Sequence, residues 1–205
     1  MTAAALAAIG GTTAFAGVAQ ATTVDVPVTE DCSLYANSGS TSFCTDTTLN
    51  VGRNFGVAGN AIHSVLQFDV AAYVPDGYHV ESATLKLKFI DQGESESWAT
   101  VHRLTSSFDG NATWNTRDGV TAWTTGGGDF GSAEDENYIS SIDLPDWADW
   151  DVTAMAADWA AGVVPNNGLA LVSPWPGVLA ATFAASEDGP STAPYIELTY
   201  EADTA

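Results

Sequence analysis

Apolar and polar residues alternate along several short segments of the chain, at the period of two that is typical of a half-buried β-strand. The pattern is clearest at residues 84–89, where Leu85, Leu87 and Phe89 are separated by Lys86 and Lys88. Further strands are predicted at Val24–Val28, His63–Val70, Ala99–Thr105, Leu169–Val172, Leu179–Ala184 and Tyr195–Tyr200, with a brief one at Leu49 and Val51. We therefore expect eight or nine strands joined by turn-rich connections.

A single segment follows the helical period instead. One helical face is formed, at spacings of three and four residues, by Val152, Met155, Ala156 and Trp159. Asp151 or Thr153 can cap the first turn, because either side-chain oxygen can accept an unpaired backbone N–H. Gly162 suits the left-handed turn that ends a helix. We expect this short helix to be scaffold that covers one end or edge of a β-rich body.

The order of these elements predicts an all-β fold, a two-sheet antiparallel β-sandwich (jelly roll) with one short helix. Residues 22–205 show no internal repeat and no linker, so they are expected to form a single domain. Between the strands, residues 106–150 read as a long irregular insertion rich in Trp and Gly, and a loop of that length is usually functional or locally disordered.

Residues 1–21 are interpreted as a signal peptide rather than as folded structure. Small and apolar residues dominate them, and Ala19-Gln20-Ala21 has the form of a signal-peptidase site, although the usual basic residues before the apolar run are missing. No later stretch resembles a transmembrane helix. The mature protein is thus expected to be secreted or held at the cell surface, without membrane insertion.

The charge is strongly acidic. The chain has 26 acidic residues against 5 basic ones, for a formal net charge of −21. Such a surface lacks the basic footprint that the phosphates of nucleic acid require, so nucleic-acid binding is excluded. Two interpretations remain open: an acidic surface that keeps a halophilic protein soluble in brine, or a surface that collects divalent cations.

Cys32 and Cys44 are the two cysteines of the chain, and they lie close together in sequence. In an oxidising compartment a disulfide across this short loop is the leading interpretation. Metal binding by two cysteines with no histidine nearby is the alternative.

The sequence offers little for catalysis. It contains neither the Gly-x-Ser-x-Gly motif of serine hydrolases nor the His-Glu-x-x-His motif of zinc proteases. His63, His79 and His102 lie on or beside predicted strands, where structural or surface roles are expected. An acid pair such as Asp143 and Asp146 carries little weight among 26 acids. We therefore expect a protein that is not an enzyme.

The aromatic residues favour sugar binding, because the apolar C–H faces of sugars stack on aromatic rings. Trp114 and Trp159 fit core positions. The better candidates for a binding platform, lying among Gly, Pro, Asp and Thr, are Trp123, Trp147, Trp150 and Trp175.

Loop carboxylates are candidate ligands for structural calcium, which prefers several oxygen ligands. Asp31 opens the cysteine loop and Asp129 lies in a glycine-rich turn, so both are predicted metal ligands. The run Asn111-Ala112-Thr113 is a sequon, which makes Asn111 a candidate glycosylation site.

The order of motifs over residues 25–201 resembles the DNRLRE (disaggregatase-related) domain and related noncatalytic carbohydrate-binding modules. The motifs that carry the resemblance include Leu49-Asn50-Val51-Gly52-Arg53, Leu66-Gln67-Phe68-Asp69-Val70, Ala112-Thr113-Trp114-Asn115, Asp151-Val152-Thr153, Asn167-Gly168-Leu169 and Pro194-Tyr195-Ile196. The resemblance implies a jelly-roll module of extracellular or cell-surface proteins, with sugar binding among its relatives. The two cysteines depart from the family pattern, so a disulfide here would be this protein's own addition.

The leading hypothesis is a secreted, noncatalytic module that binds a glycan or cell-envelope polysaccharide. The alternative is a structural surface protein that self-assembles into a matrix, filament or adhesin through protein–protein contacts. A polysaccharide-degrading enzyme is the third and least supported hypothesis.

Overall fold

The computed structural model describes residues 20–53, 59–91, 97–139, 147–174 and 181–204. Strands make up 51% of the described residues, and one short α-helix accompanies them. The strands are β1 (Thr22–Tyr35), β2 (Thr48–Arg53), β3 (Ala61–Phe68), β4 (Tyr78–Asp91), β5 (Ser97–Leu104), β6 (Phe130–Ile139), β7 (Trp147–Asp151), β8 (Leu169–Val172), β9 (Ala181–Ala184) and β10 (Tyr195–Ala202). The helices are α1 (Thr153–Ala160) and the 3-10 turns η1 (Ala36–Ser38), η3 (Val70–Tyr73) and η4 (Ser186–Asp188). The expectation of a β-rich fold with one short helix is confirmed.

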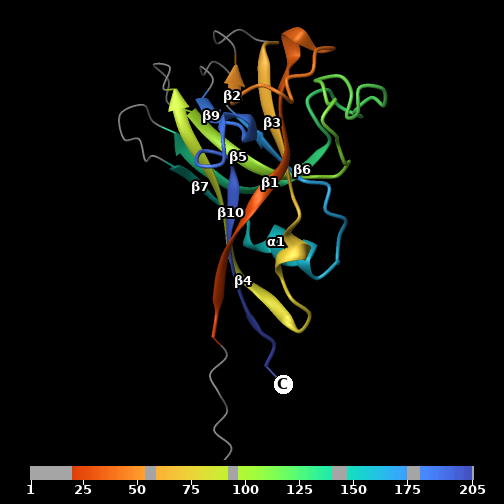
Figure 1. Ribbon diagram of the computed structural model, residues 1–205. Coiled ribbons are helices and arrows are strands. Elements are labelled where there is room, and N and C mark those ends of the chain that lie inside the picture. The colour runs from red at the N-terminus through yellow and green to blue at the C-terminus, as the bar shows by residue number, and fades with distance from the viewer. Residues whose placement is uncertain (1–19, 54–58, 92–96, 140–146, 175–180, 205) are drawn as a thin grey trace, which may run out of the picture.

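The ten strands form one continuous antiparallel sheet in the order β1-β10-β4-β9-β2-β3-β8-β5-β6, with β7 on the other edge of β4 (Figure 1). Strand β1 pairs with β10 through residues 22–27 and with β3 through residues 28–35. This double pairing closes six strands, β1, β10, β4, β9, β2 and β3, into a barrel-like ring.

The expected division into two separate sheets is therefore not clearly present. The physical reason is the length of β1, whose 14 residues pair with β10 at one end and with β3 at the other. A register shift between Val28 and Glu30 bends the strand where it leaves β10 and joins β3. Strands β9 and β2 join the two faces a second time, because β9 pairs with both β4 and β2.

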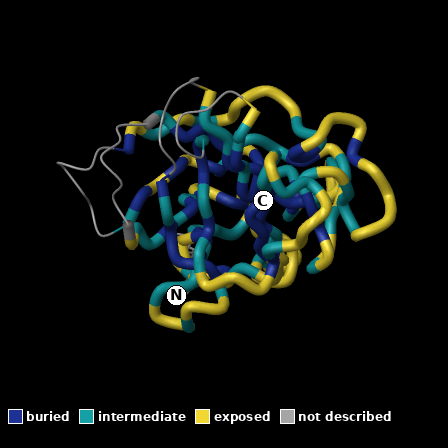
Figure 2. The backbone as a smooth tube through the Cα atoms, turned by 90° about the horizontal axis from the view of Figure 1, so that it is seen from above, coloured by how far each residue is buried: buried dark blue, intermediate teal, exposed yellow. Residues whose placement is uncertain are grey.

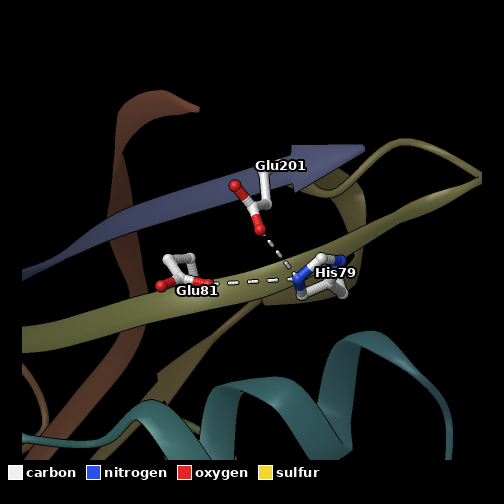
Figure 3. A group of neighbouring side chains, drawn as sticks. All are labelled: His79, Glu81 and Glu201. Carbon is white, nitrogen blue, oxygen red and sulfur yellow. Dashed lines mark ion pairs between the residues drawn. The ribbon is translucent and has the colours of Figure 1, made fainter. Parts of the chain in front are cut away.

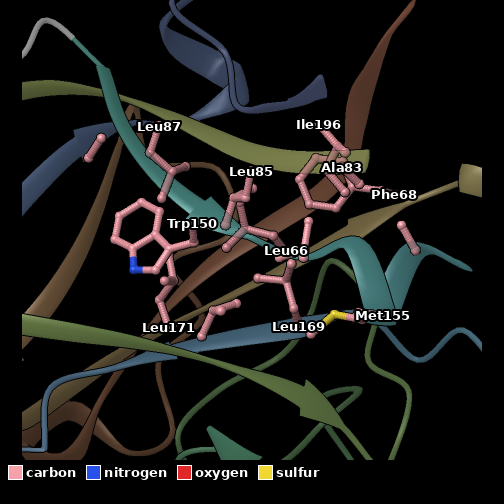
Figure 4. Packing of buried hydrophobic residues seen from close by; sticks show 14 of the residues in the cluster. Leu66, Phe68, Ala83, Leu85, Leu87, Trp150, Met155, Leu169, Leu171 and Ile196 are labelled. Carbon is pink, nitrogen blue, oxygen red and sulfur yellow. The ribbon is translucent and has the colours of Figure 1, made fainter. Parts of the chain in front are cut away.

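The main core fills the space between the faces (Figure 4). Leu85 and Leu87 from β4, Leu66 from β3 and Leu171 from β8 are completely buried, and the labelled side chains of Figure 4 point toward one another. Burying such a side chain contributes about 1.5–3 kcal/mol. The alternation at residues 84–89 thus marks a strand with one face in the core, as expected. Viewed from above, the buried backbone lies at the centre and the exposed loops surround it (Figure 2).

Helix α1 packs on β4 and η3. Met155 and Trp159 are buried beneath it, and the carboxylate of Asp151 accepts the N–H of Thr153 at 2.9 Å. The chain leaves the helix at Gly162, whose φ of 65° lies in the left-handed region that favours glycine. Asp151 thus pairs a first-turn N–H as expected, although the N-cap position itself is Val152, which makes no side-chain cap bond. The expected stop signal at Gly162 is confirmed.

The expectation of an irregular insertion across residues 106–150 is partly wrong, because this stretch contains β6 and β7. Strand β6 lies at an edge of the sheet and is exposed along most of its length, so no buried face imposes a period on its sequence.

A second, smaller core lies between β3, β5 and the loop of residues 106–129. Its buried members are Cys32, Leu34, Cys44, Val65, Leu104, Ala112, Trp123 and Ala170. Cys32 and Cys44 form a disulfide, as expected. The bridge ties the loop between β1 and β2 to this core, where Sγ of Cys44 also lies 3.5 Å from the carbonyl oxygen of Ala112.

Candidate functional site

A groove of about 470 Å³ runs along the outer face of β1, β10 and β7. The residues that line it are Asp25, Pro27, Tyr73, Trp147, Pro190, Ser191, Ala193, Pro194 and Tyr195. Three of them are aromatic and three are prolines, so the groove offers rigid apolar surface beside polar groups. Rigid aromatic surface loses little conformational entropy when a ligand binds.

The strand register brings the groove residues together from distant parts of the sequence. Tyr195 of β10 lies opposite Pro27 of β1 on one side and opposite Lys86 of β4 on the other. Across β4, Trp147 is the partner of Lys88. Side chains two residues apart on a strand share a face, and these residues all alternate with core residues of their own strands. The outer face of four neighbouring strands thereby forms one continuous surface.

Trp147 and Tyr195 form the aromatic wall of the groove. Their ring centroids are 5.2 Å apart and their planes meet at 73°, an edge-to-face arrangement that aromatic pairs favour. Both side chains are only half-buried. The ammonium group of Lys88 lies 5.8 Å from the centroid of the Trp147 ring, within the range of a cation–π contact. The two rings hold each other in place while part of each stays accessible.

Charged groups lie beside the rings. Nζ of Lys86 donates to the carboxylate of Asp149 at 2.8 Å, and this hydrogen bond is the main cause that raises the pKa of Lys86. Burial is the main cause that raises the pKa of Tyr195, and the negative charge of Asp25 adds to it. The Tyr195 hydroxyl therefore keeps its proton at neutral pH and remains a hydrogen-bond donor. Both lysines of this very acidic chain lie on the same face.

The four tryptophans expected to form a platform occupy different environments. Trp147 lines the groove. Trp123 and Trp150 are buried, and their indole N–H groups donate to the carbonyl oxygens of Thr113 and Ala99 at 2.9 and 2.8 Å. Neither of these two buried rings presents a face to solvent, so we do not include them in a binding surface. Trp175 lies outside the described residues.

Of the residues that line the groove, sequence reasoning found Trp147 alone, and Tyr195 is the most informative of those it missed. It was recognised as part of a strand, and its alternation with Ile196 and Leu198 already placed it on the outer face. The missing information was its neighbour, because the approach of Trp147 depends on both strands pairing with β4.

The two predicted metal ligands lie in separate places. Asp31 is buried, and its carboxylate accepts the N–H of Ser186 at 2.9 Å. Burial is the largest of the causes that raise the pKa of Asp31 to about 6. A buried carboxylate beside the acidic Glu30 and Glu187 would gain from a cation, but the ligand role of Asp31 stays a prediction.

Asp129 lies in a second groove of about 350 Å³, lined by Thr105, Ser106, Thr124, Thr125, Gly128, Asp129 and Phe130. Its carboxylate accepts the N–H groups of Thr124 and Thr125 at 3.0 and 2.9 Å. Desolvation raises the pKa of Asp129, but these bonds and the Ser106 hydroxyl outweigh it, so the net shift is downward. The carboxylate fixes the loop by itself, and its metal-binding role also stays a prediction.

The predicted glycosylation site lies on the surface. Asn111 is exposed, and its side-chain amide donates to the carboxylate of Asp109 at 3.3 Å. Thr113 of the same sequon is buried, with its hydroxyl 2.9 Å from that of Thr116. Modification at Asn111 stays a prediction.

The chemistry of the Trp147 groove fits a sugar better than the surroundings of Asp31 or the groove at Asp129 do. Its aromatic wall can stack on the C–H face of a pyranose ring, while the Tyr195 hydroxyl, Lys86 and the carboxylates of Asp25 and Asp149 can hydrogen-bond hydroxyl groups.

The described part of the chain contains no helix long and apolar enough to cross a membrane.

Comparison with known families agrees with this chemistry. A family model described as carbohydrate-binding module family 96 matches residues 22–200. No curated protein matches the chain. The match supports the expected likeness to carbohydrate-binding modules, whereas the narrower DNRLRE assignment is not confirmed by it.

Proposed function

The chain belongs to carbohydrate-binding module family 96, and on this premise we propose that it binds a glycan in the groove beside Trp147 and Tyr195. The observation that carries the proposal is the edge-to-face pair of these two half-exposed rings on the wall of the groove. Aromatic rings offer large apolar faces and contribute most of the energy at many interfaces, so two rings can anchor a sugar that hydrogen bonds orient.

The glycan lies along the strands in this proposal. Trp147 and Tyr195 come from strands on either side of β4, where Lys88 is the partner of Trp147 and Lys86 is the partner of Tyr195. The turn of residues 190–194 closes one side of the groove and Tyr73 of η3 contributes to its wall. A groove open along its length accepts an internal stretch of polysaccharide and does not require a chain end.

The same proposal includes a noncatalytic and secreted protein. The binding face offers stacking and hydrogen bonding, and no step of bond cleavage is needed to explain it. The disulfide between Cys32 and Cys44 fits export, because such bonds persist in oxidising compartments. Calcium bound at Asp31 or Asp129 would be held by residues that do not line the Trp147 groove.

A glycan microarray tests the proposal. The intact chain is applied at high and low salt, with and without calcium, beside a Trp147→Ala variant and the surface control Glu136→Gln. We expect binding to at least one class of polysaccharide by the intact chain and by the control, and loss of that signal for Trp147→Ala. Absence of binding to every glycan, or equal binding by Trp147→Ala, would contradict the proposal.

A further inference from the structure

The side chains of His79, Glu81 and Glu201 lie close together, on β4 and β10 (Figure 3). In the register of β4 they lie at the opposite end from Lys86 and Lys88, the partners of Tyr195 and Trp147. Nε2 of His79 lies 3.4 Å from Oε1 of Glu201 and 3.9 Å from Oε2 of Glu81. The three donor atoms all lie within 4.8 Å of one another. Among the described residues, this is the group of His, Cys, Asp and Glu side chains that lies close enough to surround one ion.

The backbone builds this group on paired strands rather than on a loop. His79 of β4 and Glu201 of β10 are direct partners in the register, so their side chains lie next to each other on one face. Next along β4, the register shifts: Thr199 pairs with Ser82 and Tyr200 with Val80, which leaves Glu81 as the unpaired residue of a β-bulge. Bulges re-aim side chains, and this one turns Glu81 toward the outer face although Val80 and Ala83 are both buried.

A third carboxylate, that of Asp203, fixes the imidazole ring. Nδ1 of His79 lies 3.0 Å from Oδ1 of Asp203, and because a carboxylate only accepts, Nδ1 carries the hydrogen of this bond. In the neutral ring, Nε2 then presents a lone pair toward the two glutamates. Three electron-pair donors then converge on one point, where either a proton on Nε2 or a metal ion at the centre would satisfy them.

The other two histidines differ from His79. Nδ1 of His63 lies 2.8 Å from the carbonyl oxygen of Gly127, and His102 contacts both the Gly131 carbonyl and the Thr100 hydroxyl. Both are more buried than His79. Of the three histidines, His79 is therefore the one best placed to supply a nitrogen ligand. The two cysteines are joined in the disulfide and offer no thiolate.

We propose that His79, Glu81 and Glu201 bind a divalent transition metal of the zinc class, with Asp203 as the hydrogen-bonded partner that orients the imidazole. One nitrogen and two carboxylate oxygens suit such an ion, and a carboxylate on the other ring nitrogen is the usual second partner of a metal-bound histidine. Metal–ligand bonds of about 2.1 Å place tetrahedral ligands roughly 3.4 Å apart. The His79–Glu201 distance of 3.4 Å meets this value, and Glu81 reaches it by a small movement of an exposed side chain.

The site has its own structural role, separate from glycan binding. It joins β4 to β10 at their end of the sheet, where the N–H of Asp203 also donates to the carbonyl of Gly77. A bound ion would hold this end of the two strands together. Its ligands do not overlap with the residues of the Trp147 groove.

Calorimetric titration of the chelator-treated full chain with zinc chloride tests the proposal, at 0.5 M sodium chloride so that diffuse binding to the acidic surface is screened. We expect one ion per chain and a rise in melting temperature when zinc is added. His79→Ala and Glu201→Gln should each weaken binding at least tenfold and abolish the thermal shift. Glu136→Gln, which removes the same charge from exposed β6, is the matched control and should bind like the intact chain.

The variants also distinguish loss of the metal ligands from a general change in the fold. Circular dichroism spectra of the apo variants that match the intact chain show that any loss of binding is local. If His79→Ala binds zinc as tightly as the intact chain, or if binding has no defined stoichiometry, the proposal is overturned. It is equally overturned if histidine NMR signals respond to pH but not to zinc, because His79 would then be a protonated ion-pair partner only.

Discussion

The rings of Trp147 and Tyr195, 48 residues apart in sequence, meet edge to face at a centroid distance of 5.2 Å. Each belongs to a different neighbour of β4, so the pair spans the strand that carries both lysines of the chain. The two rings in contact form an aromatic wall of the groove on the outer face of β10, β4 and β7. We expect the groove to determine glycan affinity, and the core and the disulfide to determine folding stability. Substitutions in each feature can distinguish these contributions.

Replacing Tyr195 by Phe removes one hydroxyl and keeps the ring. We expect glycan affinity to fall about fivefold, the effect of one lost hydrogen bond of about 1 kcal/mol, while Tyr195→Ala causes a much larger loss. Titration calorimetry of both variants with the same polysaccharide measures the difference. Equal affinities for Tyr195→Phe and Tyr195→Ala would show that the ring does not stack on sugar.

The sequence predicted those parts of the fold in which one face of a strand is buried. Leu85 and Leu87 alternate with lysines because their side of β4 faces the core. The same period of two would also have sorted the tryptophans of β7, since Trp147 and Trp150 are three residues apart and must face opposite sides. The interpretation of residues 106–150 as an irregular loop hides this alternation, so it makes surface candidates of both tryptophans.

The groove itself could not be predicted in this way, because it depends on pairing between distant segments. Nothing near Tyr195 in the sequence indicates that β7 will lie across β4 from it. The closed ring was missed for a similar reason. An alternating pattern shows that β1 is a strand, but it does not show that one strand of 14 residues pairs with β10 at one end and β3 at the other.

Asp31 should make folding stability depend on pH. Because its folded-state pKa is raised to about 6, the folded chain keeps a proton there that the unfolded chain loses at about pH 4. The free energy of unfolding therefore falls as pH rises from about 4 to 6, by on the order of 3 kcal/mol from this group. Asp31→Asn removes the ionisation and should be more stable than the unchanged chain at pH 7.5, but not below pH 4.

Urea denaturation across this pH range measures the difference between the two proteins. The general repulsion among the acids has the same sign, so the exposed neighbour Glu30 provides the control, as Glu30→Gln. Parallel pH profiles for Asp31→Asn and the unchanged chain would refute the assignment.

The disulfide should contribute substantially to stability. It closes a loop with a sequence separation of 12 residues, for which the loop-entropy model gives about 3 kcal/mol. We expect the Cys32→Ala/Cys44→Ala double variant to lose about this amount in guanidinium denaturation, and dithiothreitol to destabilise the unchanged chain similarly. A stability that responds to neither change would show that the bridge does not form in solution.

Trp150 should matter for stability rather than for binding. Its indole lies in the core and donates to the carbonyl oxygen of Ala99, so it connects β7 to β5. Trp150→Phe removes this buried hydrogen bond and also removes volume, at a combined cost of about 2–4 kcal/mol. Thermal and urea unfolding measure the loss, and glycan affinity of the folded fraction should not change. A variant of normal stability and reduced affinity would place Trp150 at the binding surface.

The most direct test uses two aromatic pairs of the same kind. Trp98 and Tyr138, cross-strand partners on β5 and β6, have ring centroids 5.1 Å apart but line neither of the two grooves. Calorimetric titration of the polysaccharide identified on the array compares Trp147→Ala with Trp98→Ala. The groove account predicts that Trp147→Ala loses at least tenfold in affinity and Trp98→Ala retains it, whereas full affinity of Trp147→Ala would contradict the account.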